Sequence, residues 1–476
     1  MKVLIAASEA HPFIKTGGLG DVIGALPQAL KNLGIDVRVV IPNYRDIKKE
    51  IKEELKFIKE FTVRVSWRNQ YCGILEYEYK GVKYYLLDNE YYFKRSGLYG
   101  YYDDGEKFAF FDRAVLEFLK EMDWKPDIIH CNDWQTGMIP VLHKVEYKNN
   151  EFFKNIKTIT SIHNLFFQGT FSPEILPELF GYDYQLFENG SLELYGGVSF
   201  LKGAINYSDK ITTVSRTYAE EIKTPEFGET LDGLLRYRGK ALKGIVNGID
   251  YDEYNPDTDE YIFKNYSSNT LGYKKDNKEA LQKELGLKVD RNIPMVGMVS
   301  RLTHQKGCDL IINMIEGILD QDIQIVILGT GDYMYEHRFK DLQNKYPDKV
   351  SANIMFDNGL AHRIYAGSDM FLMPSLFEPC GLGQLIALRY GSVPIVRETG
   401  GLKDTVTFYD ETTGVGTGFG FKNYDYNELK GTIEYALRVY KNDKNWQKLI
   451  LQSMNSDNSW NKSAIEYKEM YEELIG

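Results

Sequence analysis

Short apolar runs, each followed by a helical pattern, recur through both halves of the chain. In the first half they lie at 2–8, 36–42, 126–132, 158–164 and 209–215, and in the second at 294–302, 323–331, 351–356, 369–375 and 393–398. Near-continuous Val, Ile and Leu with helices in between indicate parallel strands that are buried on both faces. The sequence therefore predicts an α/β fold with two doubly wound parallel sheets.

Two domains also follow from length, because 476 residues exceed what one hydrophobic core holds. Between the two series of runs lies 248–278, a polar stretch rich in Asp, Asn and Tyr, which we expect to be a hinge. The stretch 458–476 has apolar residues at helical spacing. Its pattern alone is compatible with a helix that caps the second domain.

Composition excludes several classes of protein. Hydrophobic residues make up 43% and charged residues 26%, as in ordinary globular proteins, and the net charge is −11. That charge argues against nucleic acid and against anionic membrane surfaces as partners. The four cysteines form no CxxC pair, which predicts free thiols rather than zinc or disulfides. The apolar start is too short for a signal peptide, so we expect a cytoplasmic protein.

The motif KTGGLGDV (15–22) opens a helix whose apolar face runs from Leu19 and stops at Gly34. Gly17 and Gly18 allow close approach of a ligand to the backbone, and the first N–H groups of a helix attract anions. Lys15 adds a positive charge. The spacing is that of neither a P-loop nor a dinucleotide fingerprint. The alternative is a glycine-rich turn beside an incidental lysine.

Two loops of the second half carry further charged groups. In SRLTHQKG (300–307), Arg301 and Lys306 are suited to neutralising a diphosphate, although basic loop residues are often merely solvated. In LFEPCGLGQL (376–385), Glu378 precedes a predicted helix at 382–391. It is either a ligand for sugar hydroxyls or a helix cap. TGGLKDTV (399–406) repeats the glycine pair.

The strand ends of the first half place Asp133 in HCNDWQ (130–135), and His163 and Asn164 in SIHN (161–164). Ligands of open parallel sheets bind outside the carboxyl ends of the strands, so we expect these groups to face one. No metal-binding cluster accompanies them. His130 and His304 are expected to be structural.

In this order, the motifs closely resemble those of the bacterial glycogen synthases and plant starch synthases. The likeness also covers 199–215, 244–256 and the Ser-Trp pair at 459–460. It implies a GT-B fold, with two Rossmann-like domains, an interdomain cleft and a last helix that crosses back to the first domain. The implied domains are an acceptor-binding one at 1–246, completed by 457–476, and one at 247–456 that binds the nucleotide sugar.

The resemblance implies a retaining transfer of glucose from ADP-glucose to the non-reducing end of an α-1,4-glucan, with no cofactor and no metal. It assigns the diphosphate to Lys15, Arg301 and Lys306, the glucose to Asp133, His163, Asn247 and Glu378, the adenine to Phe356, and further donor contacts to Gly17, Gly18, Cys380, Gly381 and Leu382. It places the acceptor near 91–104. The residues expected to act in catalysis are Glu378, His163, Arg301, Lys306 and Asp133.

Some positions depart from the family pattern. The usual HxHDWH reads HCNDWQ here, so two histidines are replaced while Asp133 is kept. Gly20 stands where alanine is frequent, and Gly383 where a hydroxyl residue is often found. Three alternatives stay open: a UDP-glucose-dependent or sucrose-forming GT-B transferase, an inactive glucan-binding homologue, and an NAD-dependent oxidoreductase. The last lacks a GxGxxG motif. The sequence leaves the oligomeric state open.

Overall fold

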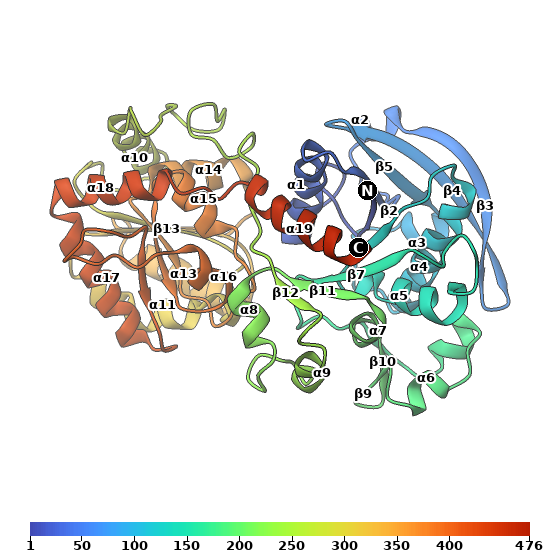
Figure 1. Ribbon diagram of the computed structural model, residues 1–476. Coiled ribbons are helices and arrows are strands. Elements are labelled where there is room, and N and C mark those ends of the chain that lie inside the picture. The colour runs from blue at the N-terminus through green and yellow to red at the C-terminus, as the bar shows by residue number, and fades with distance from the viewer. The chain divides into compact units, whose positions relative to one another are not determined.

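The computed structural model describes residues 1–476, and the chain divides into two compact units. Unit 1 comprises Met1–Asn247 and Trp460–Gly476, and unit 2 comprises Gly248–Ser459 (Figure 1). The stretch 248–278, which we expected to be a hinge, belongs to unit 2, and the boundary between the two units lies at its start, between Asn247 and Gly248. Within it the buried Tyr266 donates a hydrogen bond to the Tyr390 carbonyl at 2.7 Å, and helix α10 (Gly272–Glu284) begins. Its polar residues serve buried contacts that composition does not reveal.

Unit 1 is built on a nine-stranded sheet in the order β12-β11-β7-β6-β1-β2-β5-β4-β3. All neighbours pair in parallel except β5-β4 and β4-β3, which are antiparallel. The strands are β1 (Lys2–Ala6), β2 (Asp36–Pro42), β3 (Lys56–Val65), β4 (Arg68–Tyr79), β5 (Val82–Asp88), β6 (Ile128–Asn132), β7 (Lys157–Ile162), β11 (Lys210–Thr213) and β12 (Leu242–Gly244). A small antiparallel sheet holds β8 (Thr170–Phe171), β9 (Glu193–Leu194) and β10 (Gly197–Ser199).

The five strands predicted in the first half are confirmed as β1, β2, β6, β7 and β11. The edge formed by β3, β4 and β5 was not predicted. Most side chains of β3 are exposed or half-buried, so this strand lacks the continuous apolar run that marks a central parallel strand. In Figure 1, β3 and β4 form a long hairpin at one edge of the sheet.

The helices of unit 1 include the predicted one after the KTGGLGDV loop, which continues through Pro27. They are α1 (Gly18–Asn32), α2 (Lys49–Glu54), α3 (Glu90–Phe93), α4 (Asp104–Glu121), α5 (Met138–Leu142), α6 (Gln185–Glu188), α7 (Phe200–Tyr207), α8 (Arg216–Glu221), α9 (Asp232–Tyr237) and α19 (Trp460–Ile475).

The last helix, α19, is part of unit 1 rather than a cap on the second domain. It packs against α1, and Lys468 donates to the Leu33 carbonyl just after α1 at 3.3 Å (Figure 1). Tyr467 and Tyr471 are buried, and the Tyr471 hydroxyl lies 2.7 Å from Nδ1 of His130 in the middle of β6. The amphipathic pattern at the end of the sequence therefore buries its apolar face in unit 1.

Unit 2 is built on a six-stranded parallel sheet in the order β15-β14-β13-β16-β17-β18. The strands are β13 (Met295–Val299), β14 (Gln324–Leu328), β15 (Val350–Asn353), β16 (Met370–Met373), β17 (Val393–Arg397) and β18 (Phe419–Phe421). The first five confirm the predicted runs. The short edge strand β18, with a glycine at its centre, was missed.

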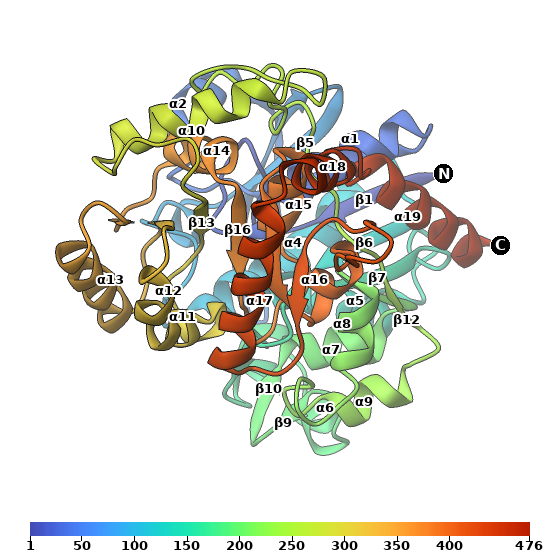
Figure 2. The same ribbon diagram turned by 90° about the vertical axis from the view of Figure 1, so that its left-hand side faces the viewer.

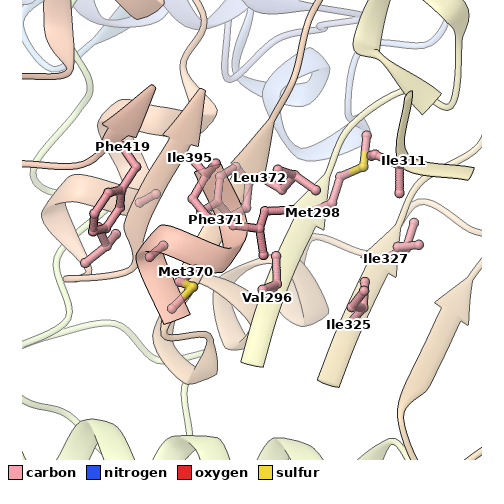
Figure 3. Close-up of a cluster of buried hydrophobic side chains, with 14 of the residues drawn as sticks. Val296, Met298, Ile311, Ile325, Ile327, Met370, Phe371, Leu372, Ile395 and Phe419 are labelled. Carbon is pink, nitrogen blue, oxygen red and sulfur yellow. The ribbon is translucent and has the colours of Figure 1, made fainter. Parts of the chain in front are cut away.

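Helices cover both faces of this sheet. In Figures 1 and 2, α14 and α15 lie above β13, whereas α11 and α13 lie below it. Figure 3 shows side chains such as Val296, Ile325 and Phe371 meeting in the core beside the strands. The helices are α10 (Gly272–Glu284), α11 (Cys308–Met314), α12 (Glu316–Leu319), α13 (Tyr333–Lys345), α14 (Asn358–Gly367), α15 (Gly383–Arg389), α16 (Gly400–Thr405), α17 (Tyr426–Tyr440) and α18 (Asp443–Met454).

Two further features bear on the sequence predictions. None of the helices combines the length and apolar composition needed to cross a lipid bilayer. The four cysteines are buried free thiols. Burial raises the pKa of the Cys308 thiol to about 12, so this thiol stays protonated and unreactive near neutral pH.

Candidate active site

The KTGGLGDV loop of unit 1 is fixed from its buried side by Glu9. The Glu9 carboxylate accepts hydrogen bonds from the backbone N–H of Thr16 at 2.7 Å and from its hydroxyl at 2.8 Å. Burial raises the pKa of Glu9, against these donors, which lower it. Lys15 is half-buried and pairs with Asp21 of helix α1 at 2.7 Å. The loop is therefore ordered by the chain itself.

Two glycines of this loop have different roles. Gly17 is the N-cap of α1, has extended backbone, and a Cβ placed on it would meet no atom within 4 Å. A Cβ on Gly20 would lie 2.4 Å from the Cβ of Lys15. The loop thus requires Gly20 for its own packing, and the alanine that is frequent in the family does not fit this conformation. The space beside Gly17 is open to a ligand.

Asp133 has a strained backbone. Its φ of 58° and ψ of −173° lie in a region that is costly for a residue with a side chain. The conformation is held by its N–H, which donates to the Ser161 carbonyl at 2.9 Å, and by its carboxylate, which accepts from the His163 N–H at 2.7 Å. Burial raises the pKa of Asp133 to about 7, although the backbone N–H groups of His163 and Asn164 lower it.

His163 lies beside Asp133, as the sequence predicts for groups at neighbouring strand ends. Its Nε2 is 2.9 Å from Oδ1 of Asn132, the last residue of β6. Burial lowers the pKa of His163 to about 4, so its ring is neutral near physiological pH. The contact with Asn132 was not predicted, because a single sequence does not show which strand-end groups bond to each other.

The other polar groups at these strand ends have structural partners. His130 is buried, and its ring nitrogens contact the Tyr471 hydroxyl at 2.7 Å and the Ser161 hydroxyl at 2.6 Å. Burial lowers its pKa to about 3. Oδ1 of Asn164 accepts from the Phe166 N–H at 3.1 Å within a turn. His130 is therefore structural, as expected.

In unit 2, Lys306 and Glu378 form an ion pair. Nζ of Lys306 lies 2.6 Å from Oε2 of Glu378, and the Ser375 hydroxyl donates to the same oxygen at 2.9 Å. Only 16% and 7% of the two charged side chains are exposed. The helix that follows, α15, has Leu382 as its N-cap and no side-chain cap. The alternative reading of Glu378 as a helix cap is therefore wrong.

The loop that carries Glu378 packs against the glycine pair of TGGLKDTV. The Gly401 N–H donates to the Glu378 carbonyl at 3.1 Å. A Cβ on Gly400, whose φ is +44°, would lie 2.0 Å from that carbonyl oxygen. This pair of glycines therefore supports the Glu378 loop. On its other side, Gln384 donates to the carbonyls of Cys380 at 2.9 Å and Gly381 at 3.0 Å.

Sequence reasoning missed Ser375 and Arg397 as supports of this loop. Arg397 ends β17 and is buried, and its Nε donates to the Ser375 carbonyl at 2.8 Å. A signal was present, since an arginine that follows a buried apolar run needs acceptors nearby. Gly383 begins α15, and its missing side chain leaves room for Phe371, which lies 3.1 Å from a Cβ built there.

Two predicted donor-site residues of unit 2 are exposed. Arg301 follows β13, and its guanidinium has no hydrogen-bond or ion-pair partner in the chain. Phe356 is 88% exposed and precedes α14. A free guanidinium and a bare aromatic ring are groups that a ligand can use. Of the neighbouring candidates, Cys380 is buried and Leu382 is half-buried.

Asn247 is the last residue of the first segment of unit 1, and its side chain is 6% exposed. Its Oδ1 has no hydrogen-bond partner, which is unusual for a buried polar atom.

In the stretch 91–104, near which the acceptor is predicted to bind, Arg95 and Asp103 form two parallel hydrogen bonds of 2.5 and 2.7 Å. Tyr91 and Tyr102 of this stretch are exposed.

Comparison with known proteins identifies the family. The chain is 69% identical over 475 residues to the glycogen synthase of Clostridium perfringens, an alignment that covers 100% of this chain and 98% of the relative. The chain belongs to the glycogen synthase and starch synthase family. Its relatives include the glycogen synthase of Clostridium kluyveri, at 59% identity over 100% of both chains. The family model described as the starch synthase catalytic domain matches residues 2–237, and that of the glycosyl transferases group 1 matches residues 277–450.

A solved structure of a family member agrees. The catalytic domain of starch synthase IV from Arabidopsis thaliana, bound to ADP and acarbose, is similar with a TM-score of 0.92 and 35% identity, covering 100% of this chain and 99% of that one. A sucrose-phosphate synthase from Thermosynechococcus elongatus shares the fold, with a TM-score of 0.63 at 16% identity. This member of the glycogen synthase family is a glycosyltransferase, and the predicted fold class, with two Rossmann-like sheets of the GT-B type, is confirmed.

Proposed function

We propose that this glycosyltransferase moves glucose from ADP-glucose to the non-reducing 4-hydroxyl of an α-1,4-glucan, with retention at the anomeric carbon. The relatives over its full length are named glycogen synthases, and the similar starch synthase was solved with ADP and acarbose. The observation that carries the proposal is the ion pair of Lys306 with Glu378 at 2.6 Å. In this pair the Lys306 ammonium is available to the phosphate of the leaving ADP, and the adjacent Glu378 carboxylate is available to the hydroxyls of the glucose.

Lys306 and Arg301 stabilise the departing ADP. One N–H of the Lys306 ammonium is used by Glu378, which leaves two donors for phosphate oxygens. All N–H donors of the Arg301 guanidinium are free, and the group binds a phosphate through two parallel hydrogen bonds. Negative charge develops on the β-phosphate as the bond to glucose breaks, and cations fixed before the reaction stabilise that charge. The chemistry needs no cofactor, because these side chains supply the charge. In unit 1, Lys15 and the backbone at Gly17 and Gly18 add further anion contacts.

The remaining site residues hold the sugar and the base. Glu378 accepts hydrogen bonds from glucose hydroxyls, and Asp133, His163 and the unpaired Oδ1 of Asn247 contribute from unit 1. The exposed ring of Phe356 stacks on adenine. The loop residues Cys380, Gly381 and Leu382 supply backbone contacts.

Glu378 orients the glucose rather than attacking it. Retaining glycosidases use two carboxyl groups about 5 Å apart, whereas the partners of Glu378 are a lysine and a serine. We therefore favour displacement on the same face of the sugar. The bond from C1 to the phosphate oxygen breaks, the acceptor oxygen bonds to C1, and the departing phosphate takes the proton of the acceptor hydroxyl. A trapped covalent glucosyl adduct of Glu378 would contradict this route.

The test is a nucleotide-release assay with ADP-glucose and UDP-glucose in turn, a malto-oligosaccharide as acceptor, and Lys306→Ala as control. We expect ADP release, with growth of the oligosaccharide through new α-1,4 linkages. In the producing cell, we expect the same reaction to take place in the cytoplasm. The ring of Phe356 stacks on uracil as well as on adenine, so it does not select the base. Faster turnover of UDP-glucose would favour the alternative of a UDP-glucose-dependent GT-B transferase. Glucan binding without nucleotide release would favour an inactive homologue.

A further inference from the structure

Asn132 is buried where β6 ends, and its side-chain amide has an unambiguous orientation. Nδ2 donates to the Ala6 carbonyl on β1 at 3.0 Å and to the His130 carbonyl at 3.3 Å. Carbonyl oxygens only accept hydrogen bonds. A flipped amide would set Oδ1 against two acceptors, so the NH₂ group must face these carbonyls.

The orientation of the amide determines the tautomer of His163. Oδ1 of Asn132 lies 2.9 Å from Nε2 of His163. Because Oδ1 only accepts, Nε2 must carry the proton. The ring is neutral, since burial lowers the pKa of His163 to about 4, so Nδ1 holds a lone pair. No residue of the chain bonds to Nδ1, which leaves this lone pair available to a ligand.

We propose that Asn132 is a positioning residue that holds His163 in the Nε2–H tautomer, so that Nδ1 accepts a hydrogen bond from the 6-hydroxyl of the donor glucose. The proposal rests on the function proposed above. It concerns a departure from the family pattern HxHDWH, which has histidine at this position. A histidine ring presents either a donor or an acceptor, depending on its own tautomer, whereas the anchored amide of Asn132 presents an acceptor only.

The first test uses the unaltered protein. Labelling the seven histidines with ¹⁵N in the ring and recording long-range ¹H–¹⁵N spectra near neutral pH distinguishes the two tautomers. The His163 signals are assigned by their loss in His163→Gln. We expect His163 to show protonated Nε2 and unprotonated Nδ1. A proton on Nδ1, or an average of the two tautomers, in the unaltered protein would overturn the proposal, and the variant serves only to assign the signals.

The second test compares donors. Asn132→Leu removes the acceptor, so we expect mixed tautomers and a loss of about fivefold to tenfold in kcat/KM with ADP-glucose, as for one neutral hydrogen bond. With ADP-6-deoxyglucose, which lacks the hydroxyl, the variant should match the wild type within about twofold. An equal loss with both donors would mean that Asn132 is merely structural.

Asn277 provides a matched control. It is also a buried asparagine, and its Nδ2 donates to two carbonyls, those of Lys264 at 2.7 Å and Tyr273 at 3.0 Å, while Oδ1 accepts from the Lys264 N–H at 3.1 Å. Asn277→Leu should lower stability yet leave the His163 tautomer and the ratio of the two donor rates unchanged. If the wild type does not turn over ADP-glucose, the proposed function fails, whereas the tautomer spectrum still decides the role of Asn132.

Discussion

The Lys306 ammonium lies 2.6 Å from the Glu378 carboxylate in a setting where little of either side chain is exposed. Each charge would be costly there without the other. Ser375 binds the same carboxylate oxygen, and Arg397 holds the backbone of Ser375. The pair is therefore fixed in position before any ligand arrives, which is the arrangement that stabilises developing charge most effectively.

Glu378→Ala should lower turnover at least about 100-fold and the free energy of unfolding by about 3 kcal/mol, because it removes the sugar contact and leaves Lys306 without its counter-ion. Asp369→Ala is the matched control, since Asp369 forms a 2.6 Å pair with the buried Lys278 elsewhere in unit 2. ADP release and urea denaturation measure both effects. A Glu378 variant that lost only stability, as the Asp369 variant should, would contradict the role in transfer.

Arg301→Ala should lower turnover about 100-fold to 1,000-fold and change stability by less than about 0.5 kcal/mol, because the exposed guanidinium has no partner in the chain. Arg438→Ala is the control, because Arg438 is an exposed arginine of α17, and this variant should retain both turnover and stability. Lys306→Ala should lose turnover similarly and, unlike Arg301→Ala, also destabilise unit 2. Near-normal ADP release by the Arg301 variant would refute its contact with the diphosphate.

Gly17→Ala and Gly20→Ala should separate ligand binding from folding. The Gly17 variant fits the structure, since its methyl group meets no atom within 4 Å, so we expect unchanged stability and weaker binding of the donor. The Gly20 variant clashes with Lys15 and should lose about 1–3 kcal/mol. Calorimetric binding of ADP-glucose and thermal unfolding measure the two outcomes. Unaltered donor affinity in Gly17→Ala would show that no ligand approaches this residue.

The pKa of Asp133, raised to about 7 by burial, predicts a pH dependence. If the carboxylate form accepts a glucose hydroxyl, kcat/KM should increase as the pH rises through about 7, and Asp133→Asn should lack this limb. The stability effect has the opposite sign. A raised folded-state pKa favours folding at low pH, and this contribution is lost as the pH rises from about 4 to about 7. Urea denaturation at about pH 5 and pH 8 should therefore show that the free energy of unfolding falls less between these two pH values in Asp133→Asn than in the wild type. An equal loss would contradict the assignment.

Tyr471→Phe should destabilise unit 1 by about 1 kcal/mol, because the buried ring of His130 loses its partner on α19. Tyr471→Ala should cost about 3–5 kcal/mol through the cavity as well. Tyr426→Phe, at an exposed tyrosine of unit 2, should be neutral. Hydrogen exchange at β6 should increase in the Tyr471 variants, and unchanged protection there would argue against the anchoring role of α19.

The sequence predicted the parallel strands because a strand buried on both faces is apolar throughout its length. It did not predict β3, whose side chains are mostly not buried, nor the contacts by which 248–278 packs on unit 2. There the buried Asp259 accepts from the Tyr390 hydroxyl and pairs with His362 at 2.7 Å, so a segment whose side chains are mostly exposed or half-buried still contributes single buried residues to unit 2.

Parallel strands end at the same edge of a sheet, and groups that follow them are therefore expected near one another. The structure agrees for Asp133 with His163 and for Lys306 with Glu378. The sequence did not distinguish the two glycine roles. Gly17 and Gly20 are identical in sequence terms, and only the atoms around each show that one faces open space and the other packs on Lys15. The bond from Asn132 to His163 depends likewise on an amide orientation set by a carbonyl of another strand.

Because α19 completes unit 1, the order of synthesis leaves that unit unfinished for some time. Helix α19 leaves the ribosome only after Gly248–Ser459 has been made, which is 212 residues counted from 248 to 459. At about 5–20 residues per second, this delay is roughly 10–40 s. During it, the surface of unit 1 around His130 that Tyr467 and Tyr471 will cover is bare, so the nascent chain offers chaperones an apolar target that the finished protein lacks.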